Sequence, residues 1–308
     1  DGSYTYIEYD EDDIYIFEDI TRLHTFSIGR DMTADYLIVA GGGRGGASVG
    51  SGGGAGGLLQ GTIDLQTNET YSIRVGDGGM ADTMLNPWSW YDYENNVTFS
   101  GDFTSYTDTN LSDPDWVNGV KGKNSYIKNS QNQYITDNAS ISLLAYGGGA
   151  GSNQSEEYQN DNSVITAFRT GGSGGGGGRH KPEGTSGITG QGYSGGNGQG
   201  NYANYGSGGG GGAAGPGYSY NDSNYPAHGG NGVISTITGI SKLYAQGGEG
   251  SLDNHGGSGN WNNVRGGGQI VDGSANGLNG TGGGGGGGSL GGRGGSGVVI
   301  LRFKKNYF

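Results

Sequence analysis

Residues 36–46 read YLIVAGGGRGG, an apolar run that passes directly into a tract in which five of six residues are glycine. The run YLIVA is continuous rather than alternating, which is typical of a strand that is buried on both faces. The glycine tract cannot continue the chain as a helix, since each interior Gly costs about 1 kcal/mol relative to Ala. This junction between a buried strand and a glycine tract predicts the architecture of the whole chain.

The same succession of strand-forming runs and glycine tracts recurs from one end of the sequence to the other. Residues 4–9 and 71–75 alternate with a period of two, which indicates half-buried strands. Glycine tracts lie between the runs, at residues 41–57, 147–151, 171–178, 187–217, 247–268 and 282–297. We predict strands at residues 3–9, 13–18, 23–28, 35–40, 57–64, 70–75, 125–127, 140–146, 233–237, 242–245 and 297–303.

The composition excludes several protein classes. Glycine supplies 75 of the 308 residues, about 24% against a usual share near 7%. Collagen is excluded because Gly does not recur at every third position and only 5 residues are Pro. The longest apolar run is about five residues, far short of the roughly 20 that a membrane-spanning helix needs.

Ordered structure with this much glycine requires main-chain hydrogen bonding in place of a large apolar core. An extended helix of the polyproline II type turns every three residues and leaves each N–H and C=O pointing outward. Without Cβ atoms, such helices can pack side by side and bond to several neighbours. We therefore predict an all-β fold: β-sandwich or jelly-roll-like strands framing a bundle of polyglycine II helices, with essentially no α-helix, in a single domain of residues 1–308.

One motif resembles a nucleotide site. Gly41, Gly43 and Gly46 have the G-x-G-x-x-G spacing, and Asp64 follows about 20 residues later. That motif works only where a helix begins, because the helix N-terminus holds the pyrophosphate. Residues 41–57 contain 11 glycines, so no helix is expected and we interpret the match as accidental.

No other pattern indicates catalysis or metal binding. The four histidines lack the spacing of metal ligands, and no G-x-S-x-G turn opens a helix. The acidic residues 10–13 could bind Ca²⁺ through carboxylate oxygens, but a charged turn between two strands is the favoured interpretation. The sequence thus predicts no catalytic, cofactor-binding or metal-binding residues.

The balance of charged residues indicates which classes of partner this protein is expected to avoid. There are 16 Lys and Arg against 29 Asp and Glu, and the net charge is −13. Such a surface repels phosphate backbones and anionic lipid, which argues against nucleic acid partners and membrane insertion. Seven Asn-x-Ser/Thr sequons indicate either a secreted, glycosylated surface or merely Asn/Ser/Thr-rich loops. They begin at Asn68, Asn96, Asn110, Asn138, Asn153, Asn221 and Asn279.

Two further segments are candidates for contacts with partners. Residues 80–124 form a glycine-poor insertion, and connections of this length are commonly functional. We expect its aromatic side chains to contact a ligand or partner, namely Trp88, Trp90, Tyr91, Tyr93 and Trp116. The first strand is a candidate for addition to another subunit's sheet, through Tyr4, Tyr6, Ile7 and Tyr9; the alternative is that it pairs within its own chain.

Three stretches together carry a family resemblance. They are YLIVAGGG at 36–43, GGGAGGLL at 52–59 leading to YSIRVGDGG at 71–79, and GGRGGSGVVILRF at 291–303. They resemble the glycine-rich domain of viral and bacteriophage tail-fibre or surface proteins. More distantly, they are similar to the glycine-rich extracellular region of anaplastic lymphoma kinase-type receptors. The resemblance implies strands framing polyglycine II helices, an extracellular or virion-surface setting, and no catalytic residues.

These observations predict a non-enzymatic extracellular structural protein, a subunit or module of a fibre, filament, or virion or cell-surface assembly. Self-assembly into a homo-oligomer is the expected partnership. The alternative is an adhesin or receptor-binding module that recognises a glycan or a cell-surface protein through its loops. The aromatic insertion, the acidic start and the sequons depart from phage proteins and suit secretion from a eukaryotic cell or its virus.

Overall fold

The computed structural model describes residues 4–9, 12–47, 50–80, 88–92, 97–101, 121–152, 169–178, 182–199, 205–221, 226–253, 266–267, 275–288 and 291–305. These residues form β-strands joined by extended segments and contain no helical element. The strands are β1 (Thr5–Tyr9), β2 (Asp12–Phe17), β3 (His24–Ser27), β4 (Met32–Val39), β5 (Leu58–Leu65), β6 (Thr70–Arg74), β7 (Trp88–Asp92), β8 (Val97–Gly101), β9 (Ser125–Lys128), β10 (Leu144–Ala145), β11 (Tyr205–Gly206), β12 (Val233–Ser235), β13 (Lys242–Tyr244), β14 (Leu252–Asp253) and β15 (Val298–Lys304).

Each strand predicted from the sequence overlaps an observed one, but one of them is much shorter than expected. The stretch 140–146 contains only the two-residue β10. Ser140 has a positive φ of 63°, and Ser142 forms an isolated bridge with Thr136, so a tight loop interrupts the expected strand. Strands β7, β8, β11 and β14 were not predicted, because their residues show no sustained alternation.

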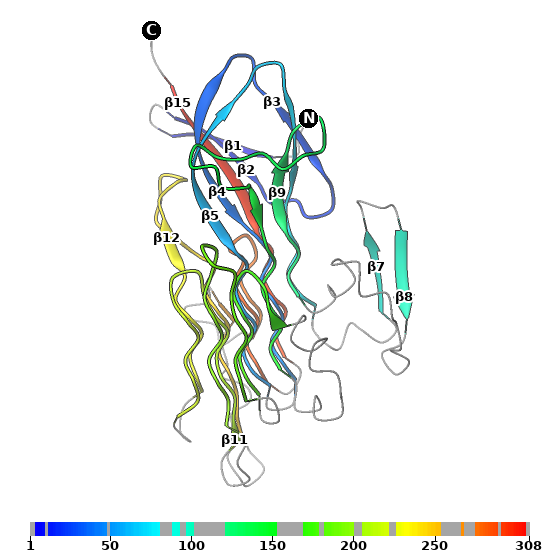
Figure 1. Ribbon diagram of the computed structural model, residues 1–308, viewed down its shortest axis with the longest axis vertical. Coiled ribbons are helices and arrows are strands. Elements are labelled where there is room, and N and C mark those ends of the chain that lie inside the picture. The colour runs from blue at the N-terminus through cyan, green and yellow to red at the C-terminus, as the bar shows by residue number, and fades with distance from the viewer. Residues whose placement is uncertain are drawn as a thin grey trace.

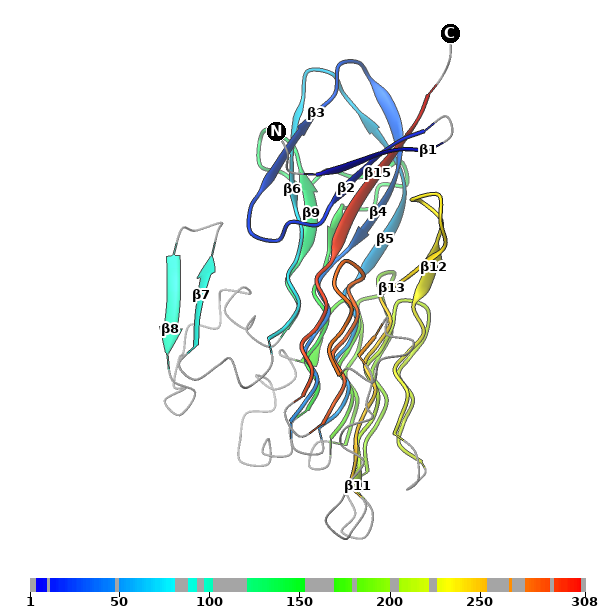
Figure 2. The ribbon, with the colours of Figure 1, turned by 180° about the vertical axis from the view of Figure 1, so that it is seen from behind.

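Two antiparallel sheets form a sandwich at one end of the molecule (Figure 1). One sheet has the strand order β1-β2-β15-β4-β5, and the other has the order β10-β9-β6-β3. The last strand, β15, lies between β2 and β4, pairing Leu301 with both Tyr15 and Tyr36. The C-terminal segment therefore completes the sheet that the N-terminal strands begin, as the view from behind also shows (Figure 2).

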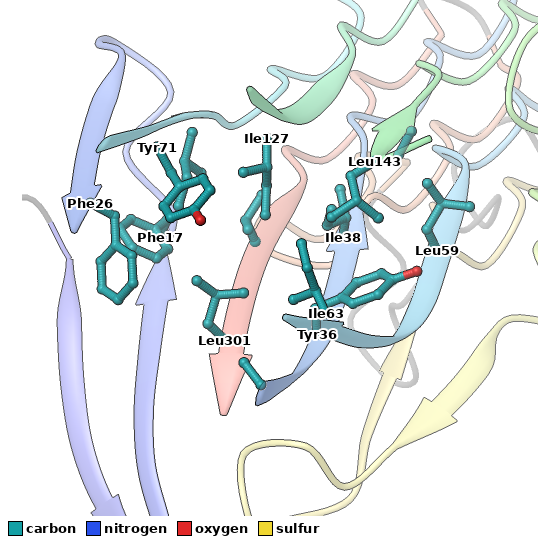
Figure 3. Packing of buried hydrophobic residues seen from close by; sticks show 14 of the residues in the cluster. Phe17, Phe26, Tyr36, Ile38, Leu59, Ile63, Tyr71, Ile127, Leu143 and Leu301 are labelled. Atoms are coloured by element: carbon teal, nitrogen blue, oxygen red, sulfur yellow. The ribbon is translucent and has the colours of Figure 1, made fainter. Parts of the chain in front are cut away.

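The apolar core lies on both faces of the five-stranded sheet. An inner cluster fills the space between the two sheets, where Tyr36 and Leu301 lie opposite Tyr71 and Ile127 (Figure 3). An outer cluster lies on the opposite face, where Leu37 and residues of β15 pack against the β12–β13 hairpin. Because β4 contributes alternate side chains to each cluster, its apolar run is continuous, as the sequence predicted.

Buried hydrogen bonds connect the two sheets with each other and with the loop between β9 and β10. The buried hydroxyl of Tyr36 donates a hydrogen bond to Asp137 Oδ2 at 2.8 Å. The other Asp137 oxygen accepts main-chain N–H groups of Ala139 and Ile141 at 2.9 and 2.8 Å. Ser125, fully buried, donates its hydroxyl to the carbonyl of Val39. These bonds compensate the desolvation of groups that would otherwise destabilise the fold.

The sandwich strands continue into a lattice of glycine-rich segments, which fills the other half of the molecule (Figures 1 and 2). Residues 51–57 show its repeat, because successive amides donate to three different segments in rotation and every third amide returns to the same one. The pairs are Gly52–Gly208 and Ala55–Gly211 at 3.0 and 2.9 Å, Gly53–Gly285 and Gly56–Gly282 at 2.8 and 2.9 Å, and Gly54–Gly149 and Gly57–Tyr146 at 2.8 Å each.

The carbonyls of the same segment accept bonds from three further segments. Gly43 N–H donates to the Gly54 carbonyl at 2.8 Å, and Gly248 N–H donates to that of Gly53 at 3.0 Å. Residues 51–57 are therefore surrounded by six neighbours, which bond to them through residues 40–46, 146–152, 173–176, 208–211, 248 and 282–285. A helix with three residues per turn and outward-pointing amides has this bonding pattern. The predicted polyglycine II bundle is confirmed, and with it the all-β fold.

Candidate functional site

The outer edge of the five-stranded sheet is formed by β1, and it carries the aromatic residues predicted for assembly. Tyr4 and Tyr6 are 37% and 49% exposed, although both rings contact Tyr15 on the inner face of the sheet. Ile7 packs against the outer cluster, and Tyr9 is exposed beside the β12–β13 hairpin at Gly239. β1 pairs with β2, as the intrachain alternative required, which leaves its other edge facing outward.

Charged side chains lie along the β1 edge of the sheet. The Tyr6 hydroxyl donates to Asp13 Oδ1 at 2.6 Å, and this hydrogen bond raises the pKa of Tyr6 to about 12. Lys305 forms ion pairs with Glu8 and Asp13, and these carboxylates raise the pKa of its ammonium group. Consequently, Tyr6 stays neutral and Lys305 stays positively charged near neutral pH, and the ammonium group of Lys305 partly balances the negative charge at this edge.

Four of the seven predicted sequons begin at residues that the structure describes, and all four are exposed. They are Asn68, Asn138, Asn221 and Asn279. Asn138 lies beside β5, where its N–H donates to the Thr62 carbonyl at 3.1 Å. Asn279 differs from the others, since its side-chain oxygen accepts a bond from Ser296 N–H at 3.1 Å. Asn96, Asn110 and Asn153 lie outside the described residues.

The aromatic insertion is described only in part. Trp88, Trp90 and Tyr91 belong to β7, which pairs with β8 as a two-stranded sheet of its own. Tyr93 and Trp116 lie outside the described residues. The role of these five residues in ligand contact therefore stays a prediction.

The residues that mimic a nucleotide site belong to the lattice. Gly41, Gly43 and Gly46 donate their N–H groups to carbonyls at 2.8–3.0 Å in other segments, so these amides are already bonded within the chain. No helix follows them within the described residues. This geometry agrees with the interpretation that the motif is accidental.

The two histidines that the structure describes, His24 and His228, each lie within hydrogen-bond distance of a protein oxygen atom. His24 is buried, with Nε2 at 2.8 Å from the Asp19 carbonyl, and His228 Nδ1 lies 3.2 Å from Glu249 Oε1. His180 and His255 lie outside the described residues. Within the described part of the chain, no cluster of three or more His, Asp or Glu residues could hold a metal ion, and no helix is long and apolar enough to cross a membrane.

Sequence reasoning missed one exposed group of side chains on the lattice. Tyr218 is 57% exposed, and its ring meets that of His228 edge-on at a centroid distance of 6.3 Å. Glu249 lies beside His228, and Tyr193, 51% exposed, belongs to a neighbouring segment. The signal in the sequence was a pair of isolated tyrosines inside glycine tracts, where a large side chain has to point out of the lattice.

Comparisons with known proteins agree with this architecture. A family model described as a glycine-rich domain matches residues 21–304, a span that includes most of the sandwich and all of the described lattice. Neither the curated proteins nor the solved structures contain a match to this chain. The residues that match the family model therefore include the buried glycine segments, their three-residue repeat of main-chain hydrogen bonds and most of the flanking strands. The chain belongs to the glycine-rich domain family.

Proposed function

We propose that this chain is a non-enzymatic extracellular structural protein, a subunit or module of a fibre, filament, or virion or cell-surface assembly. The observation that carries the proposal is the six-neighbour packing of residues 51–57. Buried lattice positions are occupied mainly by glycine, together with alanine and serine. Two arginines, Arg44 and Arg169, are also buried there, and Arg169 donates to the main-chain carbonyls of Gly176 and Glu183. The lattice therefore presents few side chains that could act on a substrate. What such a lattice does supply is a rigid body held by main-chain hydrogen bonds.

Self-association tests this proposal. We expect the full chain, secreted from a eukaryotic host, to form oligomers or filaments in negative-stain electron microscopy and in analytical ultracentrifugation at physiological salt. Physiological salt matters because the charge of −13 makes separate copies repel, and the repulsion is screened beyond about 8 Å at that ionic strength. Particles that grow no larger than a monomer or a dimer at the highest attainable concentration would contradict the proposal.

A second candidate is an adhesin that binds a glycan, and Tyr218 with His228 and Glu249 favours it. An exposed ring beside a carboxylate can stack on a sugar while a polar group bonds to its hydroxyls. Deleting residues 80–124 tests the alternative that the insertion carries binding, and Tyr218→Ala tests the lattice group. On a glycan array, a loss of binding in one variant assigns the site, and wild-type binding that survives both changes excludes both sites.

A further inference from the structure

The two edges of the five-stranded sheet differ in how they are covered. At the β5 edge, Leu58 N–H donates to the Gln191 carbonyl at 3.0 Å, and Asn138 N–H donates to that of Thr62 at 3.1 Å. At the β1 edge, residues 4–9 make no main-chain bond to the described residues except those of the β1–β2 ladder. An uncovered edge presents a row of unpaired N–H and C=O groups, which is a template for another strand.

The sequence of β1, Thr5-Tyr6-Ile7-Glu8-Tyr9, is suited to pairing with itself in the antiparallel direction. Centred on Ile7, such a pair places Tyr6 opposite Glu8 of the second copy, and Thr5 opposite Tyr9. No residue of β1 then faces a like charge directly. Parallel pairing in register would place Glu8 opposite Glu8, and like charges that are directly opposite destabilise a strand pair. The strand therefore favours a two-fold symmetric arrangement.

Side-chain exposure supports the same surface. Tyr4 and Tyr6 continue the inner aromatic face beyond Tyr15 and Phe17, yet they remain 37% and 49% exposed. On the opposite face, Ile7 is only partly buried against the outer cluster. An added strand would cover side chains on both faces while it pairs the main-chain groups that have no partner among the described residues.

We propose that two copies of this chain join through antiparallel β1 strands, related by a two-fold axis at Ile7, so that their five-stranded sheets become one continuous sheet. This interface is isologous and closes on itself. Because Leu58 and Thr62 at the β5 edge are already bonded within the chain, the sheet stops there and forms a dimer rather than an open ribbon. The inference rests on the proposed structural function and specifies its first assembly step.

Disulfide trapping tests the register, and the chain contains no Cys. Opposite residues have Cβ atoms about 4.5–5.5 Å apart and diagonal ones lie at about 7–8 Å, while a disulfide needs about 3.5–4.5 Å. Under mild oxidation, a mixture of Tyr6→Cys and Glu8→Cys proteins should give at least about ten times more disulfide dimer than either variant alone. Gln60→Cys, an exposed position on β5 away from the β1 interface, is the matched control and should form no disulfide dimer. Equal cross-linking in all samples would overturn the inference.

A charge pair at one position tests the interface without cysteine. Tyr6→Lys would face Glu8 of the second copy, whereas Tyr6→Glu would place two carboxylates opposite each other. We expect the dimer dissociation constant of Tyr6→Glu to exceed that of Tyr6→Lys at least tenfold in analytical ultracentrifugation. Thermal unfolding of both variants controls for folding. Identical dissociation constants in two folded variants would refute the β1 interface.

The outcomes separate this inference from the proposed function. If large assemblies form but β1 cysteines do not cross-link, assembly uses another surface, and this inference falls while the structural function stands. If the register-specific disulfide forms but no larger assembly appears in microscopy, the β1 dimer stands and the filament function falls.

Discussion

At the scale of single residues, the lattice depends on the absence of Cβ atoms at particular positions. A Cβ atom at Gly54 would overlap the main-chain carbonyl of Ser173, and one at Gly53 would overlap that of Gly43. The obstructing atoms are main chain that is itself hydrogen-bonded, so it cannot rotate away. Ala55, by contrast, directs its methyl group into the outer cluster. Glycine is thus required by close approach rather than by turn conformation at these sites.

Substituting one central glycine should therefore unfold much of the lattice. We predict that Gly54→Ala lowers the free energy of unfolding by at least about 3 kcal/mol, at or beyond the upper end of typical overpacking. The control is Gly215→Ala, whose Cβ would lie 3.8 Å from its nearest neighbour, Asn231 N, and should change stability by less than about 1 kcal/mol. Urea denaturation measures both, and equal effects would argue against the packing described.

His24 should make stability depend on pH. Burial lowers the pKa of its imidazole, and Nδ1 has no hydrogen-bond partner among the described residues, so the neutral form is favoured in the folded state. The unfolded chain takes up the proton first as pH falls through about 6.5. Below that value stability is lost, by at most about 1.4 kcal/mol per pH unit for one proton.

The measurement compares the free energy of unfolding at about pH 7 and about pH 5.5 in the wild type and in His24→Gln. Glutamine keeps an amide donor for the Asp19 carbonyl but does not titrate, so the variant should be less stable at neutral pH and lose less on acidification. An unchanged pH dependence in the variant would assign the effect to other groups.

At the scale of elements, each glycine segment continues a strand and shares its hydrogen-bond ladder. The β4–β5 pair ends at Val39 and Leu58, and the next bond, Ala40 N–H to the Gly57 carbonyl at 3.0 Å, already belongs to the lattice. The strands fix the direction and register of the glycine segments, which have no side chains with which to select a register. The sandwich thus determines how the glycine segments are aligned with one another in the lattice.

Amide hydrogen exchange should reveal that order. We predict that the amides of residues 51–57, which lie at the centre of six neighbours, exchange only through global unfolding, as the most protected amides of a domain do. The amides of residues 238–240, in the turn between β12 and β13, are the internal control and should exchange much faster, since Gly239 N–H donates to the Thr236 carbonyl of the same turn rather than to a distant segment. Random-coil rates across residues 51–57 would show that the lattice does not persist in solution.

At the scale of the whole molecule, the sandwich and the lattice are stabilised by different interactions. The sandwich has an ordinary apolar core, whereas the lattice relies on main-chain hydrogen bonds and on weak Cα–H···O contacts of about 0.5–1 kcal/mol each. This division explains how a chain with only 31% hydrophobic residues folds. Large side chains that the lattice cannot hold, such as those of Tyr193 and Tyr218, lie on the exposed surface.

Secretion from a eukaryotic cell should give uneven glycosylation. A sequon needs a hydroxyl residue at its third position. At Asn68 and Asn138 that residue is exposed, whereas Thr281, which serves Asn279, is buried and donates its hydroxyl to the Leu278 carbonyl at 2.6 Å. We predict high occupancy at Asn68 and Asn138 and lower occupancy at Asn279, measured by glycopeptide mass spectrometry. Higher occupancy at Asn279 would contradict this ranking.

The sequence by itself determined the class of fold, because composition and periodicity act locally. Alternation in residues 4–9 and the continuous run at 36–40 each encode how many faces of a strand are buried, and glycine content excludes helices wherever it is high. The same local logic identified β1 as a candidate edge strand, and β1 does form an edge of the five-stranded sheet. It missed Tyr218 beside His228, because their contact depends on which lattice segments are neighbours.

Only the tertiary structure decided which segments meet. Glycine segments have no side chains to distinguish them, so nothing in residues 51–57 specifies residues 282–285 rather than another tract as a neighbour. The choice follows from the strands that deliver each tract, such as β15 inserted between β2 and β4. Among the described residues, it likewise left the outer edge of β1 without a main-chain partner, while Asn138 and Gln191 bond to β5. Edge exposure is a property of the assembled sheet and not of one strand.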